Sequence, residues 1–345
     1  MNTPLLKVEN LTKHFRLGTD FLKKAVPIVR AVEDVSFSVE PGETLCIVGE
    51  SGCGKSTIAR LLMRIVEPTC GRVMIDGTDI AGLKKQPLRE WRRRMQMVFQ
   101  DPYSSLNPRL TAGQIITEPV DNFERLNRQD REALAADLLR KVGMSPEMMH
   151  RLPSELSGGQ RQRLGIARAL ALKPSLIVAD EAVSALDVSV QAQILNLLVD
   201  LQQQMGIAYV FISHDLSVVQ HIAHRVAVMY LGRIVELAPC EVLFARPTHP
   251  YTEALIAAAP VPDPARVRLE VPIEGEVPSP INPPRGCAFH PRCPLAVERC
   301  RTVVPPLVPM ADGRVVACHV RAPSMDVPAD PIAAAAAPFT HISQP

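Results

Sequence analysis

Apolar and polar positions follow two alternating patterns over the first two thirds of the chain. Continuous apolar runs at Leu45–Gly49 and Leu176–Asp180 are typical of strands that are buried on both faces. Ala208–Ser213 and Arg225–Tyr230 indicate further strands of this kind. Segments with helical periodicity separate these runs, so the region from about Pro4 to Phe244 predicts an α/β fold with a largely parallel sheet.

This pattern changes at three points further along the chain. Between Asp101 and Leu156 it is helical and polar, which predicts a helical insertion without a strand. After Pro247 proline becomes frequent, and the periodicity typical of sheets disappears. From about Arg321 the composition is rich in alanine and proline, which predicts a disordered tail over residues 321–345.

A glycine-rich loop joins the first buried run to a segment with helical periodicity. The loop has the pattern G-x-x-x-x-G-K-S and consists of Gly49, Glu50, Ser51, Gly52, Cys53, Gly54, Lys55, Ser56 and Thr57. Between a strand and a helix, this pattern directs backbone N–H groups and the positive end of the helix dipole at a phosphate group. Lys55 is expected to reach the β- and γ-phosphates, and the Ser56 hydroxyl is expected to bind Mg²⁺. The position of the pattern between a predicted strand and a predicted helix favours phosphate binding over a glycine-rich turn that binds no ligand.

Two carboxylates end the second buried run. Asp180 is placed to hold Mg²⁺ through water, and Glu181 is placed to polarise an attacking water as a general base. His214 closes a further predicted strand and is placed to sense the γ-phosphate. A lone histidine before an aspartate is more often a cap or turn residue, but the surrounding motifs favour a functional role for His214 here.

A second anion-binding segment lies between the loop and the carboxylates. It consists of Leu156, Ser157, Gly158, Gly159 and Gln160, followed by a run with helical periodicity. A serine and two glycines at a helix start can bind phosphate, yet this segment has no lysine of its own. We therefore expect two chains to meet head to tail, each segment completing the other chain's phosphate loop.

In this order the motifs resemble those of the ATP-binding subunits of ABC transporters, over about residues 5–245. The resemblance implies a P-loop NTPase core with a small antiparallel β subdomain, a helical subdomain at about residues 101–156 and a C-terminal cysteine-containing extension. It assigns the Walker A motif to residues 49–57, the signature to 156–160, the Walker B motif to 176–181 and the D-loop to 184–187.

The resemblance also implies roles for single residues. Gln100 matches the Q-loop glutamine, a ligand of Mg²⁺ together with Ser56 and Asp180. His214 matches the switch histidine, and Phe15 is the candidate for the aromatic ring that stacks on adenine. Because no catalytic position is degenerate, we expect the chain to bind ATP and Mg²⁺ and to hydrolyse ATP.

Charge and hydropathy narrow the possible partners. The chain has 38 basic and 36 acidic side chains, a net charge of +2, which does not indicate nucleic-acid binding. The alternative function is a non-transport ABC ATPase that acts on nucleic acid or ribosomes. Two features argue against it: residues 55–157 lack the sustained heptads of a coiled coil, and the chain has one cassette. With no signal peptide and no apolar run long enough to span a membrane, we expect contact with a membrane only through a permease.

The C-terminal part extends the resemblance to a narrower family. Residues 249–255 and 286–319 resemble the C-terminal extension of oligopeptide/dipeptide importer ATPases, and residues 100–109, QDPYSSLNPR, resemble the second ATPase of such systems. The implied domains are an ABC ATPase domain at 1–245, the extension at 246–320 and the tail. The implied cargo is a di- or oligopeptide, with nickel or glutathione carried by relatives. The implied partners are a second, distinct ATPase, two permease subunits and an extracytoplasmic peptide-binding protein, at the cytoplasmic face of the inner membrane.

Four of the eight cysteines lie in this extension with the spacing C-x₅-C-x₆-C-x₁₇-C, at Cys287, Cys293, Cys300 and Cys318. Four thiolates can hold a 4Fe-4S cluster, and the family resemblance supports one. Zinc is the alternative metal, with a nearby histidine replacing one thiol, although the close C-x-x-C pairs usual for zinc are absent. Free thiols are the third possibility. Any metal here is expected to be structural, because the cysteines lie outside the ATPase motifs.

Overall fold

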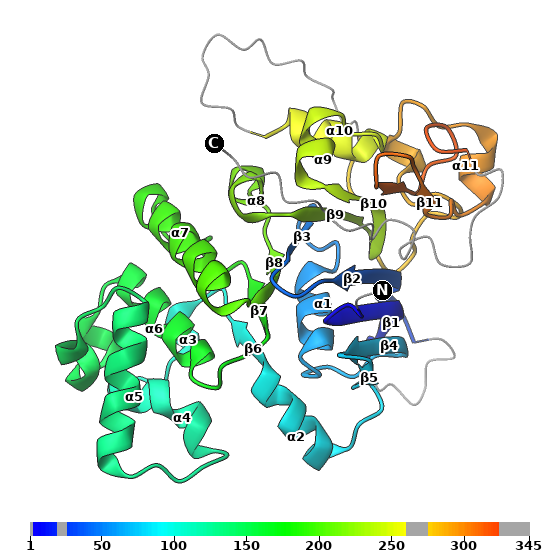
Figure 1. The fold of residues 1–345 in the computed structure, drawn as a ribbon. Helices are drawn as coiled ribbons and strands as arrows, with labels where there is room; N and C mark the ends of the chain where they lie inside the picture. Colours follow the sequence, from blue (N-terminus) through cyan, green and yellow to red (C-terminus); the bar gives the residue numbers. More distant parts are fainter. Residues whose placement is uncertain (1–2, 19–25, 260–274, 324–345) are drawn as a thin grey trace.

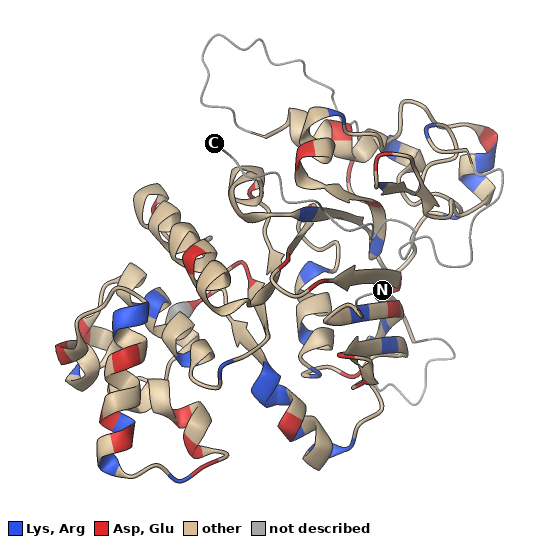
Figure 2. Ribbon diagram, viewed as in Figure 1, with Lys and Arg blue, Asp and Glu red and all other residues tan. Residues whose placement is uncertain are grey.

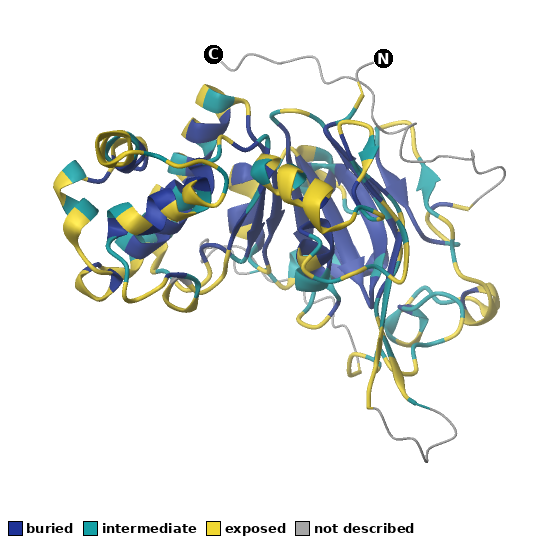
Figure 3. Cartoon of the chain, turned by 90° about the horizontal axis from the view of Figure 1, so that it is seen from below, coloured by how far each residue is buried: buried dark blue, intermediate teal, exposed yellow. Residues whose placement is uncertain are grey.

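The computed structural model describes residues 3–18, 26–259 and 275–323, which form two β-sheets and the helices around them (Figure 1). The predicted tail lies outside the described residues from position 324 onward. Figure 3 shows that buried residues follow the strands, whereas exposed residues lie on the outward faces of the helices.

The larger sheet has eight strands in the order β11-β12-β10-β9-β3-β8-β7-β6. Strand β3 pairs in parallel with β8 and β9, and β7 pairs in parallel with β8 and β6. The parallel strands are β3 (Thr44–Val48), β6 (Met95–Val98), β7 (Leu176–Asp180), β8 (Ala208–Ile212) and β9 (Arg225–Tyr230). The four strands predicted from continuous apolar runs are confirmed, and each is buried because helices or the second sheet cover both faces.

The other three strands of this sheet are antiparallel. Strand β10 (Arg233–Pro239) pairs with β9 and with β12 (Val315–Val316), which in turn pairs with β11 (Val308–Pro309). The C-terminal extension therefore contributes two strands to the main sheet, although its sequence shows no sheet periodicity. Strands of two residues are too short to produce an alternating pattern, which is why the sequence gives no indication of them.

A buried ion pair fixes the extension to the sheet. Glu236 of β10 is fully buried and lies 3.3 Å from the Arg314 guanidinium, which is also buried. The Glu236 carboxylate also accepts hydrogen bonds from the backbone N–H groups of Thr248 and His249. Two charges removed from water persist only when they are paired and hydrogen-bonded, as these are.

The smaller sheet is antiparallel, with the order β2-β1-β4-β5. Its strands are β1 (Leu6–Arg16), β2 (Ile28–Val39), β4 (Cys70–Ile75) and β5 (Thr78–Asp79). Its buried face and helix α1 (Lys55–Leu62) share one apolar cluster with β3 of the main sheet, including Phe37, Leu45 and Ile58. The small antiparallel β subdomain expected from the family resemblance is confirmed.

The helices α3 to α6 form a separate group to one side of the sheets (Figure 1). The group comprises α3 (Pro102–Ser105), α4 (Ala112–Asp121), α5 (Arg128–Lys141), two 3₁₀ helices (Pro146–His150 and Pro153–Glu155) and α6 (Gly158–Leu170). Residues 101–156 contain no strand, so the predicted helical insertion is confirmed. A capping box starts α4, where Thr111 and Gln114 satisfy each other's backbone N–H groups.

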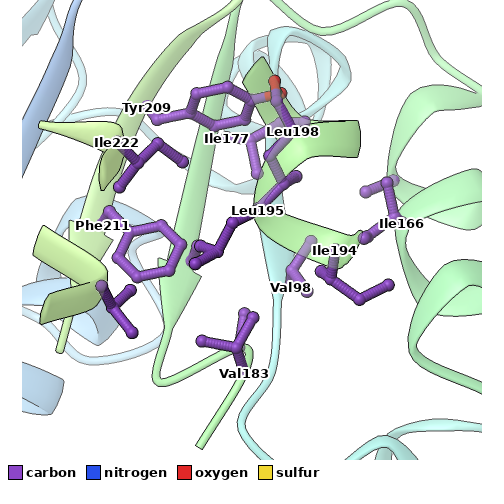
Figure 4. Packing of buried hydrophobic residues seen from close by; sticks show 14 of the residues in the cluster. Val98, Ile166, Ile177, Val183, Ile194, Leu195, Leu198, Tyr209, Phe211 and Ile222 are labelled. Carbon is purple, nitrogen blue, oxygen red and sulfur yellow. The ribbon is translucent and has the colours of Figure 1, made fainter. Parts of the chain in front are cut away.

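Helix α7 (Val188–Met205) covers the main sheet with its apolar face. Figure 4 shows its side chains Leu195 and Leu198 beside Tyr209 and Phe211 of β8, whereas Ile194 lies between Val98 and Ile166. The remaining helices are α2 (Lys85–Arg94), α8 (Leu216–Ile222), α9 (Cys240–Ala245), α10 (Pro250–Ala257) and α11 (Glu298–Thr302). Among the described residues, no helix combines the length and apolar character that crossing a bilayer requires.

Basic and acidic side chains are interspersed over most of the chain, with a basic run at the end of α2 (Figure 2). In this run Arg93 pairs with Glu124 at 2.5 Å, and Arg94 pairs with Asp76. Acidic neighbours thus compensate part of the positive charge of this run, which lies on a solvated face of α2.

Candidate nucleotide site

The phosphate loop is a tight turn between β3 and α1 that depends on its glycines. Gly54 has a φ of 106°, a left-handed conformation that side chains disfavour. A Cβ atom at Gly54 would collide with the Ala31 carbonyl, and one at Gly49 would collide with the Met229 carbonyl. The loop backbone therefore packs directly on β2 and β9, which fixes its path.

Lys55 turns back into this loop. Its ammonium group is buried and donates hydrogen bonds to the Gly49 carbonyl at 2.8 Å and the Glu50 carbonyl at 3.0 Å. Two neutral carbonyls only partly compensate a buried positive charge. The arrangement therefore suits an anionic ligand placed against the loop.

Ser56 and Asp180 meet at the start of α1. The Ser56 hydroxyl donates a hydrogen bond of 3.0 Å to the Asp180 carboxylate, which ends β7. Burial raises the pKa of Asp180 above its ordinary value, while the hydrogen bond from Ser56 acts in the opposite direction. A carboxylate and a hydroxyl held side by side are oxygen ligands of the kind that Mg²⁺ prefers, so these residues fit the predicted metal.

Glu181 is the point on which two other predicted residues converge. Gln100 donates a hydrogen bond of 2.8 Å to one Glu181 carboxylate oxygen, and His214 Nδ1 lies 3.4 Å from the other. Glu181 has a φ of 48°, a left-handed conformation that costs a non-glycine residue roughly 1–2 kcal/mol. Its backbone N–H donates to the Ile212 carbonyl at 3.0 Å, which holds this conformation at the end of β7. Such strain is typical of functional sites.

The second anion-binding segment lies elsewhere in the chain. Ser157 caps α6 in a capping box with Gln160, and Ser157 and Gly158 are exposed. Among the described residues, no hydrogen bond or ion pair joins the segment to residues 49–57. The segment belongs to the α3–α6 group, whereas the phosphate loop lies at α1 (Figure 1). Within one chain the structure thus keeps the two predicted phosphate-binding segments apart.

Phe15 lies near the end of β1 and is 36% exposed. It pairs with Val29 of β2, two residues from Ala31, whose carbonyl contacts the phosphate loop. The Lys13 ammonium lies 5.0 Å from the centre of the Phe15 ring. This position is near the loop, and stacking on adenine stays a prediction.

The structure adds three residues that the sequence did not single out. The Glu50 N–H donates a hydrogen bond of 2.9 Å to the Tyr251 hydroxyl, and Arg292 pairs with the Glu50 carboxylate at 3.0 Å. Tyr230 lies between them and accepts a hydrogen bond from Arg292. No sequence signal relates these distant positions to the loop, because only the folded extension brings them together.

The four C-terminal cysteines lie in one module but do not form a metal site there. Burial, with a smaller contribution from the other three thiols, raises the pKa of the Cys287 thiol to about 11. The Cys287 N–H donates to the Cys300 carbonyl at 2.8 Å, and none of the cysteines forms a disulfide. In the part of the chain that the structure describes, no three His, Cys, Asp or Glu side chains form a group that could hold a metal ion. The expectation of a metal at these cysteines thus finds no support in the geometry.

Comparison with known proteins extends these observations. A family model described as "ABC transporter" matches residues 32–184, and one described as "Oligopeptide/dipeptide transporter, C-terminal region" matches residues 235–300. A probable peptide ABC transporter ATP-binding protein of Sinorhizobium fredii is 76% identical over 100% of this chain and 98% of its own length. A di/tripeptide transport ATP-binding protein of Pseudomonas aeruginosa is 51% identical, covering 91% of this chain and 97% of its own.

Solved structures agree with the fold. A dimeric ATP-binding cassette in a post-hydrolysis state, bound to ADP and phosphate, aligns with a TM-score of 0.61 and 30% identity. The alignment covers 68% of this chain and 98% of that one. The P-loop fold class expected from the sequence is confirmed.

The glycine geometry of the loop gives a direct test. Gly54→Ala is expected to lower the free energy of unfolding by more than about 1 kcal/mol, because the added Cβ meets a backbone carbonyl at a positive φ. It is also expected to abolish the rise in melting temperature that Mg–ADP causes. Gly82→Ala is the matched control, since a Cβ there meets open space. Chemical denaturation and thermal melting with and without Mg–ADP measure both effects, and a Gly54→Ala protein that behaves like the control contradicts this account of the loop.

Proposed function

The chain belongs to the ATP-binding subunits of peptide ABC transporters, and from this premise we propose that it hydrolyses ATP to energise the import of di- or oligopeptides. The observation that carries the proposal is the convergence of Gln100 and His214 on Glu181, beside the Ser56–Asp180 pair and the phosphate loop. The peptide cargo rests on the names of relatives and on the matched C-terminal region. The alternative, an ABC ATPase acting on nucleic acid or ribosomes, receives no support from these relatives.

We propose the following division of roles within the site. Lys55 and the loop N–H groups neutralise and orient the β- and γ-phosphates, and Phe15 stacks on the adenine. Ser56, Asp180 and Gln100 hold Mg²⁺, which supplies charge neutralisation for the phosphates when it is bound.

Glu181 is proposed as the general base. Glu181 lies one residue beyond Asp180, the proposed Mg²⁺ ligand, and this position brings its carboxylate near the γ-phosphate. There the carboxylate accepts a proton from the attacking water. The hydrogen bond from Gln100 and the nearby His214 imidazole orient the carboxylate. His214, of which the side chain is 58% exposed, can also reach a γ-phosphate oxygen.

A second ATPase chain is proposed to complete the site. The segment of Ser157, Gly158 and Gly159 begins a helix, is largely exposed and lies apart from the chain's own phosphate loop. Facing a partner's loop, it supplies N–H groups and a helix dipole to the partner's nucleotide. We propose that the partner is a distinct second ATPase, and that this chain is itself of the second-ATPase type.

We propose the family's assembly for the rest of the complex. The chain serves two permease subunits and an extracytoplasmic peptide-binding protein, and it is peripheral to the cytoplasmic face of the inner membrane. Residues 1–245 form the ATPase domain, with residues 101–156 as its helical part, and residues 246–320 form the extension. Contact with the permease runs through Gln100 and the exposed segment that follows it.

For the four cysteines we propose a structural 4Fe-4S cluster, with zinc or free thiols as the competing outcomes. What supports the cluster is the ligand set, four thiols in one module, with the Cys287 N–H donating to the Cys300 carbonyl at 2.8 Å. Because no three of them form a metal-holding group in the described structure, assembly of a cluster requires the thiols to be drawn closer together.

The cluster has a simple spectroscopic test. Anaerobically purified protein is expected to show an absorbance shoulder near about 400 nm that disappears when Cys300 is replaced by serine, since iron–sulfur clusters are coloured. Cys70→Ser is the control, because Cys70 is exposed and lies outside the extension. Colourless protein with stoichiometric zinc, or with no metal, contradicts the cluster.

The role of Glu181 has a kinetic test. Glu181→Gln is expected to reduce ATP turnover at least about a hundredfold, because the amide cannot accept the proton, while ATP binding is retained. The variant is therefore expected to accumulate as an ATP-bound dimer with its partner, measured by size-exclusion chromatography. Glu132→Gln is the control, since Glu132 is an exposed carboxylate that pairs with Arg128 on α5. Turnover of Glu181→Gln near that of the control removes Glu181 from the role of base.

A further inference from the structure

The C-terminal extension reaches the phosphate loop through one ion pair. Two nitrogens of the Arg292 guanidinium lie 3.0 and 3.3 Å from the two oxygens of the Glu50 carboxylate. The Arg292 side chain is 8% exposed and that of Glu50 is 26% exposed. A two-pronged pair that is mostly removed from water is stronger and more directional than the ordinary surface ion pair.

The position of Arg292 is fixed by aromatic residues behind the loop. Arg292 ends a short 3₁₀ helix (His290–Arg292) and donates a hydrogen bond of 3.3 Å to the Tyr230 hydroxyl. The Tyr230 ring lies 4.7 Å from the Tyr251 ring and 5.3 Å from the Phe289 ring, measured between centroids. The guanidinium thus contacts Tyr230 of β9, whose ring packs against Tyr251 and Phe289 of the extension.

Glu50 is the residue through which these contacts act on the loop. The Tyr251 hydroxyl accepts a hydrogen bond from the Glu50 N–H, and Arg292 holds the Glu50 carboxylate. The Glu50 carbonyl in turn accepts hydrogen bonds from the Lys55 ammonium at 3.0 Å and the Cys53 N–H at 3.3 Å. Residues of the chain beyond position 245 therefore fix one end of the loop that positions Lys55.

Charge makes this contact relevant to nucleotide binding. Glu50 is the only acidic residue of the loop, residues 49–57. A carboxylate close to the phosphates repels them unless an opposite charge compensates it, and the repulsion is strong where water is partly excluded. Arg292 supplies that opposite charge.

We propose that Arg292 is a positioning residue of the nucleotide site, which neutralises Glu50 and holds the phosphate loop in its binding conformation. On this view the extension is part of the nucleotide site rather than a separate appended module. Arg292 touches no reacting atom, so its effect is on nucleotide affinity. The inference rests on the proposed function, because it requires residues 49–57 to bind nucleotide.

The test measures the affinity of the full-length chain for a fluorescent ADP analogue with Mg²⁺. Arg292→Gln is expected to weaken binding about tenfold, because it leaves the Glu50 charge uncompensated. Glu50→Gln introduced into Arg292→Gln is expected to restore at least about threefold of that loss, since the repelling charge is then gone. A role of Arg292 in folding alone predicts no such rescue. Arg301→Gln is the matched control, an arginine of the same module whose ion pair with Glu298 is exposed.

Kinetics of the complete complex provide a second readout. Arg292→Gln is expected to raise the KM for ATP by a similar factor and to leave kcat within about twofold, because it weakens binding of ground state and transition state alike. If Arg292→Gln does not fold, Arg292→Lys replaces it. Lysine keeps the charge but loses the two-pronged geometry, so an approximately threefold loss of affinity is expected.

The outcomes separate this inference from the function on which it rests. Wild-type protein that binds no Mg–nucleotide overturns the proposed function itself. Wild-type binding together with equally tight binding by the Arg292 variant overturns the positioning role of Arg292. Weakened binding that Glu50→Gln does not relieve also overturns it, because the loss then does not pass through the Glu50 charge.

Discussion

Parallel pairing of β3, β8 and β7 brings the carboxyl ends of three strands to one edge of the main sheet, and the nucleotide site is built there. The phosphate loop follows β3, Asp180 and Glu181 lie at the end of β7, and His214 lies beyond β8. The hydrogen bond of 3.0 Å between Ser56 and Asp180 joins the first two of these segments. Because each loop begins where a buried strand ends, the side chains that follow these strands lie close enough to contact one another. Ligand sites at this edge are the general rule for open α/β sheets.

The three antiparallel strands of the same sheet have a different role. Strand β12 pairs with β10, and the buried Glu236–Arg314 ion pair fixes the extension there. This attachment carries Arg292 to the back of the phosphate loop, where it meets Glu50. The loop is thus held from two sides, by the strand and helix that frame it and by a segment more than two hundred residues away. The extension and the ATPase core share one apolar cluster as well, since Phe289 packs with Tyr230 and Tyr251.

Local patterns in the sequence were enough to predict much of this site. Strands buried on both faces produce continuous apolar runs, and the glycine pattern of residues 49–57 reflects positive φ angles and close backbone contacts that the structure shows. Gln100 entered the predicted site only through the family resemblance, and the contacts of Gln100 and His214 with Glu181 were not predicted, because contacts between distant segments leave no periodic signal. The Arg292–Glu50 pair was missed for the same reason, and the strands β11 and β12 were missed because two residues are too few to show an alternating pattern. The cysteine spacing predicted a ligand set but could not predict whether the thiols meet at one point.

We have proposed that this chain contains the catalytic groups for hydrolysis but only half of each nucleotide site. The most direct measurement is ATP turnover per chain as a function of the concentration of the chain and of its partner ATPase. Because the segment at Ser157 lies apart from the chain's own phosphate loop, turnover is predicted to be near background in dilute protein and to rise to saturation as partner is added. Turnover per chain that is substantial in dilute protein and independent of concentration and partner would contradict the account, since a single chain would then hold a complete site.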